Sequence, residues 1–144
     1  KLPFKSLRDI RILLLNNLCA HLTKQSWADL CLLAGLAGIG EELLFRGVIQ
    51  IWIENVWGIS AAIIITSLLF ALVHAITPIY ALLAAMISVY LGLSLDYDAS
   101  RNLLTPIIIH GLYDFIMLNL LMYQYRQLTA KKDETQNPNS LRNP

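Results

Sequence analysis

The sequence has few charged residues: Lys, Arg, Asp and Glu make up 15% of its 144 residues, against about a quarter in soluble domains. Hydrophobic residues make up 56%, and the mean hydropathy is +0.56. This balance indicates a protein in contact with a lipid bilayer, and we expect no nucleic-acid partner. The length indicates a single domain.

Cysteine is scarce as well. Cys19 and Cys31 both lie in apolar surroundings and form no Cys-x-x-Cys pair, so the sequence predicts no disulfide framework. We expect both to be small buried side chains. No secretory signal pattern is visible, and the first residue is Lys1 rather than Met, so we expect a mature or truncated piece of a longer protein.

The apolar residues fall into four stretches, and a bilayer-spanning helix needs about 20 residues. The stretches are 27–54, 59–76, 79–95 and 103–125. They predict an all-α fold, a polytopic membrane helix bundle with four transmembrane helices. Their boundaries carry helix signals: Ser26 as an N-cap, Thr77-Pro78 as an N-cap and first residue, and Pro106, which starts or kinks the last helix.

The two ends of the chain differ from this core, which spans residues 26–126. Residues 1–25 begin with basic side chains, and their apolar part is too short to span, so we expect an interfacial amphipathic helix. Residues 127–144 are polar, and we expect a disordered cytosolic tail. Apart from Arg46 and Arg101, every Lys and Arg lies on the side of the two termini, which places both termini in the cytoplasm.

Three charged residues occur within six positions of the first stretch: Glu41, Glu42 and Arg46. A charge at the bilayer centre costs at least about 2.5–3.5 kcal/mol, so such residues face protein or a water-filled cavity. Glu42 and Arg46 are four residues apart on one helix face and can pair. Glu41 lies about 100° around the helix. We therefore expect Glu42 to be held by Arg46 and Glu41 to be free to act as a general base.

Other ionisable residues lie in or near the later stretches. His74 lies at the end of the second, and His110 and Asp114 are four residues apart in the fourth. A carboxylate with two imidazoles suits activation of water, because the carboxylate takes a proton and an imidazole can donate to an oxyanion. The same set could ligate a metal, although the two His at i,i+4 of a zincin signature are lacking.

Three motifs resemble, in order, those of a known family of intramembrane proteases. They are Glu41-Glu42-x-x-x-Arg46, Phe70-x-x-x-His74 and His110-x-x-x-Asp114. The family is the CAAX-protease and bacteriocin-processing (Abi) family, which includes the Rce1-like prenyl-protein endopeptidases. The resemblance implies a hydrolase that cleaves a peptide bond in a membrane-associated peptide or protein.

The resemblance also implies roles for single residues. Glu41 would activate water with His74 as its partner, while Glu42, Arg46 and Phe70 would support them. His110 and Asp114 would hold the oxyanion or a metal-bound water. A divalent metal such as zinc is left open; its ligands would be Glu41, His74, His110 and Asp114.

Asp114 differs from the eukaryotic prenyl proteases, which the resemblance gives Asn at this position. An ionised Asp cannot donate to an oxyanion. It would instead orient His110, bind a metal or stay protonated.

Two other function classes stay open. One is a non-proteolytic member of the same fold, acting as a membrane scaffold or as a bacteriocin-immunity protein. The other is a small transporter or proton relay, which ranks lowest because no inverted repeat is evident. The compact core resembles bacterial members, so we expect the inner (plasma) membrane of a bacterium. The pattern does not identify the substrate.

Depth in the membrane constrains the site. His74 lies one turn from the expected cytosolic end of its helix, whereas Glu41 lies roughly 22 Å past Ser26. They meet only if the first helix starts above the membrane or tilts, or if the second turns while still buried. We expect a site in the cytosolic half, with the Glu41 helix projecting into the cytosol and water entering from that side.

Overall fold

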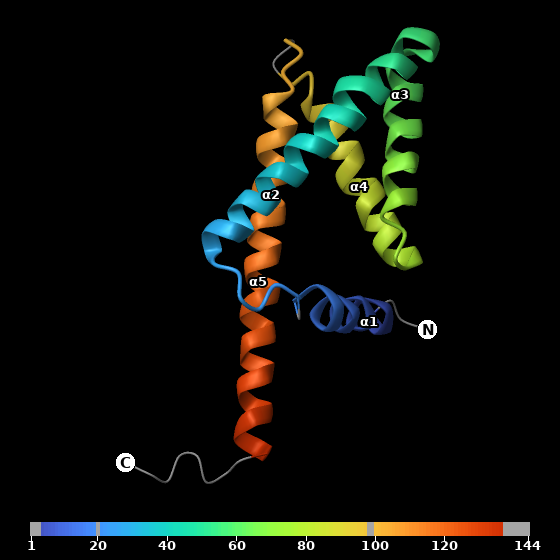
Figure 1. Ribbon diagram of the computed structural model, residues 1–144. Coiled ribbons are helices and arrows are strands. Elements are labelled where there is room, and N and C mark those ends of the chain that lie inside the picture. The colour runs from blue at the N-terminus through green and yellow to red at the C-terminus, as the bar shows by residue number, and fades with distance from the viewer. Residues whose placement is uncertain (1–3, 20, 98–99, 137–144) are drawn as a thin grey trace.

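The computed structural model describes residues 4–19, 21–97 and 100–136, and these residues are helical or lie in the connections between helices (Figure 1). The elements, in chain order, are α1 (Phe4–Leu14), the π-helical turn η1 (Leu15–Cys19), α2 (Trp27–Glu42), the π-helical segment η2 (Leu43–Gln50), α3 (Ile51–Val73), α4 (Pro78–Ser94) and α5 (Leu104–Gln136). The all-helical prediction is confirmed for the described residues.

The backbone turns sharply at Gly58. This glycine has φ +81°, inside the left-handed region, and it interrupts α3, because a residue without Cβ adopts that conformation at little cost. One helical run therefore extends from Trp27 through α2 and η2 to the break, and a second run continues to Val73. The predicted end of the first helix near Gly58 is confirmed.

The helix starts follow the predicted signals. Ser26 Oγ accepts a bond from the Asp29 amide at 3.2 Å, and the Asp29 carboxylate accepts one from the Ser26 amide at 2.8 Å, a reciprocal capping arrangement. Thr77 Oγ1 caps α4 by accepting from the Tyr80 amide. Pro106 lies in the first turn of α5 and therefore starts that helix rather than kinking it.

Two helical segments are long and apolar enough to cross a membrane: Trp27–Val73, which contains the Gly58 break, and Leu104–Lys132. In the core helix of a soluble protein most residues are buried, but only 28% and 11% of the most apolar windows are buried here. α4 has 17 residues and falls just short of this length. The long segments suggest a membrane protein, and the topology of four spans stays a prediction.

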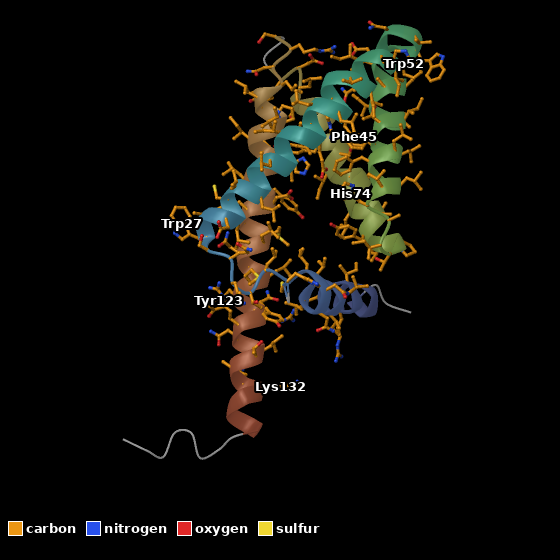
Figure 2. All side chains as sticks on the ribbon, viewed as in Figure 1. Trp27, Phe45, Trp52, His74, Tyr123 and Lys132 are labelled. Carbon is orange, nitrogen blue, oxygen red and sulfur yellow. The ribbon has the colours of Figure 1, made fainter. Side chains whose placement is uncertain are left out.

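Aromatic side chains also face outward. Trp27 is 71% exposed and Trp52 is 64% exposed, and Figure 2 shows them projecting away from the helices near opposite ends of the first helical run. Trp is enriched where membrane helices meet the lipid–water interface. These two side chains therefore suit the two edges of a bilayer.

The helices pack as two pairs, α2 with α5 and α3 with α4. Figure 1 shows α2 crossing α5 obliquely, while α3 and α4 lie side by side. The crossing is close at Gly38, where an added Cβ would lie 2.9 Å from the Gly111 backbone nitrogen. This crossing places Glu41 and Glu42, at the end of α2, beside His110 on α5; the tilt of the first helix in a membrane stays a prediction.

Two predictions about the ends and the cysteines are wrong. α5 continues to Gln136, so residues 127–136, predicted to be disordered, are helical. Adding residues to an existing helix requires no new nucleation; residues 137–144 lie outside the described part. Cys31 is exposed, unlike the buried Cys19, because it lies on the outward side of α2. In a bilayer that side would contact lipid.

Candidate active site

The helix packing brings all seven predicted site residues to one place. Their positions are the last turn of α2, η2, the end of α3 and the first half of α5. The residues are Glu41, Glu42, Arg46, Phe70, His74, His110 and Asp114.

Glu42 is the centre of the buried part of the site. Its side chain is 0% exposed, and its Oε1 accepts from Arg46 Nη1 at 3.0 Å and from His110 Nδ1 at 2.7 Å. The predicted Glu42–Arg46 pair is therefore present. The bond to His110 was not predicted, because it depends on how α2 crosses α5. A buried carboxylate is stable only when it is paired in this way.

Arg46 is buried on every side as well. Its Nη2 donates to the carbonyl oxygen and to Oγ of Ser88, both at 2.8 Å. Its guanidinium carbon lies 5.2 Å from the centre of the Phe70 ring, a cation–π distance. Ser88 was missed in the sequence analysis, which identified no site residue in the stretch 79–95. The signal available was a serine in a helix without Asp, Glu, Lys, Arg or His.

The two imidazoles are oriented alike. His74 Nδ1 lies 2.8 Å from the Phe70 carbonyl oxygen, and the ring stacks on Phe70 with centroids 4.3 Å apart. Because a carbonyl only accepts, His74 Nδ1 carries the proton. His110 Nδ1 donates to the Glu42 carboxylate in the same way. Each ring therefore has its Nε2 atom available to the site.

Both Nε2 atoms face Glu41. Glu41 Oε2 lies 3.6 Å from His74 Nε2 and 3.8 Å from His110 Nε2. This oxygen has no hydrogen-bond partner among the described protein atoms, although the side chain is 32% exposed. Asp114 Oδ2 is 3.5 Å from His110 Nε2. These separations exceed a direct hydrogen bond, but one water can bridge such groups.

Five of the seven predicted site residues line a cavity of about 180 Å³: Glu41, Phe70, His74, His110 and Asp114. α4 and α5 complete its wall with residues that the sequence did not identify: Tyr80, Leu83, Ala84, Ile87 and Tyr113. The cavity therefore combines a polar end that can activate water with an apolar wall that can contact a substrate side chain.

The donor set suits a metal chemically, because carboxylates and imidazoles with occupied Nδ1 atoms are usual ligands. Within the described ranges, however, no three His, Cys, Asp or Glu side chains are placed to hold a metal ion. We therefore derive no step through a metal.

The comparisons with known proteins agree with the motifs. The family model described as type II CAAX prenyl endopeptidase Rce1-like matches residues 23–116. That range includes every residue of the site described above. Neither the curated proteins nor the solved structures gave a match. The matched range covers more than half of the chain, and the chain therefore belongs to the Rce1-like type II CAAX prenyl endopeptidase family.

Proposed function

We propose that the chain is an intramembrane endopeptidase in which Glu41 activates a water molecule to hydrolyse a peptide bond. The observation that supports this most directly is the unequal setting of the two neighbouring carboxylates. Glu42 is neutralised by Arg46 and bonded to His110, whereas Glu41 lies at the cavity with an oxygen that has no bond to Arg46. One carboxylate supports the site and the other is free to take a proton.

The chemistry follows from these positions. A water between Glu41 Oε2 and His74 Nε2 gives a proton to Glu41 as its oxygen attacks the substrate carbonyl carbon. The carbonyl oxygen becomes an oxyanion, and His110 in its imidazolium form donates Nε2–H to it. Glu41 then transfers its proton to the leaving amine as the C–N bond breaks. The products are a carboxylic acid and an amine.

The environment of His110 supports the role assigned to it. Its Nδ1–H is held by Glu42, so Nε2 can donate only when the ring is cationic. Glu42 and Asp114 both favour that cation, because each brings a carboxylate within 3.5 Å of one ring nitrogen. Asp114 then orients and charges His110 and is not itself the oxyanion donor. This role needs the negative charge of an ionised carboxylate, which a neutral Asn at this position would not supply.

The membrane arrangement is part of the proposal. Four helices cross the bilayer, both termini are cytoplasmic, and the cavity opens to the cytosol, so the substrate is a membrane-associated peptide or protein. A water-filled cavity would lower the cost of placing these charged groups in a bilayer. Membership of an intramembrane protease family and the exposed apolar helix surfaces support this arrangement.

Incubating the purified protein in detergent with a peptide library tests the activity. The wild type should cleave a subset of peptides, and Glu41→Ala, purified in the same folded state, should leave them intact. Glu54→Ala is the control, since Glu54 is a carboxylate of the same helical run that binds Arg101 rather than the site. Library peptides left intact by the wild type would favour a scaffold or immunity role for this fold.

A further inference from the structure

Ser88 on α4 contacts the buried ion pair of the site. Its side chain is 1% exposed, and both its carbonyl oxygen and its Oγ accept from Arg46 Nη2. Arg46 Nη1 in turn holds Glu42 Oε1, which accepts from His110 Nδ1. A continuous series of hydrogen bonds therefore connects α4 to His110 on α5.

The register of α4 fits this series. Ser88 and Gly92 are four residues apart and contact Arg46 and Gln50, which are also four residues apart. Gln50 Nε2 donates to the Gly92 carbonyl oxygen at 3.3 Å, and a Cβ on Gly92 would lie 3.0 Å from Gln50 Oε1. The small side chains of α4 therefore leave room for the two long polar side chains. Of these two contacts, the one between Ser88 and Arg46 lies nearer the cavity.

Glu42 holds His110 well only if Arg46 holds Glu42. Arg46 Nε has no hydrogen-bond partner among the described residues, and neither has Glu42 Oε2. The hydrogen bonds that hold the guanidinium are thus those of Nη1 and Nη2. Without the Ser88 hydroxyl, Nη2 keeps one acceptor instead of two, and Arg46 is less firmly fixed. Glu42 is then held less firmly by Arg46, and His110 less firmly by Glu42.

We propose that Ser88 is a positioning residue that, through Arg46 and Glu42, fixes the His110 ring with its Nδ1–H on the Glu42 carboxylate and its Nε2 facing Glu41 at the cavity. The groups that face His110 are Glu41 and Glu42 from α2, Asp114 from α5 and the Phe70 ring from α3. The glutamate at Nδ1 is the group that Ser88 controls. The consequence for catalysis rests on the proposed function, whereas the state of the ring does not.

Ser94 provides a matched control on the same helix. It is also buried, and its Oγ donates to the Leu91 carbonyl oxygen within α4 at 2.8 Å. Ser94→Ala therefore removes the same hydroxyl from the same helix without touching the Arg46 series. A general effect of losing a buried hydroxyl would appear in both variants.

The test is nitrogen-15 NMR of the full chain in detergent with labelled histidine, recorded at a pH where the rings are neutral. The chain has three histidines, so each ring can be assigned by substitution. In the wild type, the neutral His110 ring should carry its proton on Nδ1, because Nδ1–H donates to the Glu42 carboxylate. Ser88→Ala should give His110 Nδ1 a partly deprotonated signal in the neutral ring. His74 should be unchanged, because the Phe70 carbonyl holds it, and Ser94→Ala should match the wild type.

A wild-type His110 spectrum in folded Ser88→Ala would overturn the proposal, and so would an equal change in Ser94→Ala. The His74 and His21 signals report whether the variant is folded. If Ser88→Ala does not fold, Ser88→Cys decides, since a thiol is a weak acceptor of similar size. Wild-type His110 signals in Ser88→Cys would then overturn the proposal, and a partly deprotonated Nδ1 would support it.

Turnover gives a separate result. If the chain is a protease, kcat in Ser88→Ala should fall about twofold to tenfold, the effect of one hydrogen bond, with KM unchanged. A changed His110 spectrum in a chain that cleaves no peptide would contradict the proposed function and leave the positioning role intact. An unchanged His110 spectrum in an active protease would contradict the positioning role and leave the proposed function intact.

Discussion

Arg46 has contacts in every direction, so its removal should affect folding as well as chemistry. Arg46→Ala leaves Glu42 buried with its charge unpaired, and breaking a buried pair typically costs about 3–5 kcal/mol. We expect lower yield and a lower Tm in detergent, measured by thermal unfolding. Arg46→Ala with wild-type stability would show that the pair does not hold the fold.

A double variant separates charge from packing. Glu42→Gln with Arg46→Met removes both charges and keeps similar volumes, and replacing a buried pair with well-packed neutral residues is often tolerated. We expect its Tm to lie above that of Arg46→Ala. The double variant should nevertheless lose activity, because a neutral amide in place of the Glu42 carboxylate no longer favours the cationic form of His110. A Tm equal to or below that of Arg46→Ala would mean that the loss comes from packing around the guanidinium.

The side-chain pairs differ in how far the sequence predicted them. Glu42 and Arg46 are four residues apart on one helix, so local geometry alone predicts their contact. The bond from His110 to Glu42 joins residues 68 positions apart, and only the crossing of α2 and α5 creates it. Ser88 was missed for the same reason, since its partner lies on another helix. The nearness of Glu41 to His74 was predicted from the motifs and not from the helix pattern.

The close crossing of α2 and α5 at Gly38 should be sensitive to the addition of one methyl group. Gly38→Ala places Cβ 2.9 Å from the Gly111 backbone nitrogen, so the helices must move apart, and overpacking of this kind typically costs about 1–3 kcal/mol. We expect a lower Tm and, because Glu42 and His110 lie on these two helices, a weakened Glu42–His110 bond. Thermal unfolding and the His110 Nδ1 signal measure the two effects.

Gly35→Ala is the matched control on the same helix, since nothing lies within 4 Å of the added Cβ. Alanine also favours a helix over glycine, so its Tm should equal or exceed that of the wild type. Equal stability of the Gly38 and Gly35 variants would show that the close crossing is not maintained.

The helices themselves were largely predictable, and their limits less so. Caps at Ser26 and Thr77 and the break at Gly58 fix three helix boundaries, and each follows from residue types that can be recognised in the sequence alone. The end of α5 was misjudged, because a polar composition was taken to mean disorder although residues 127–136 extend an existing helix. The π-helical segment η2 was not predicted. Arg46 and Gln50 within it donate to Ser88 and Gly92 of α4, contacts between helices that no local sequence pattern shows.

The arrangement of the whole chain in the membrane can be tested with reporters. The distribution of Lys and Arg predicts that both termini are cytoplasmic. Reporter fusions at Lys1 and Pro144 should therefore both give the cytoplasmic signal. An opposite signal at either end would contradict four membrane crossings.

Access to the cavity can be tested in the same membranes. Cysteines at Leu72, Ala75 and Ala81, in a background without Cys19 and Cys31, flank His74 and the start of α4. A membrane-impermeant thiol reagent should label them from the cytosolic side, because the proposed site opens to the cytosol. Labelling from the opposite side alone would refute a cavity open to the cytosol.

The measurement that tests the central claim most directly is the turnover of Glu41→Gln against a peptide that the wild type cleaves. The substitution replaces one carboxylate oxygen with an amide NH2 group. It removes the base while keeping the shape of the side chain. Since Arg46 pairs with Glu42 and not with Glu41, the variant should fold with a Tm near that of the wild type. We predict no detectable cleavage by this folded variant, and near-normal turnover would remove Glu41 from the mechanism.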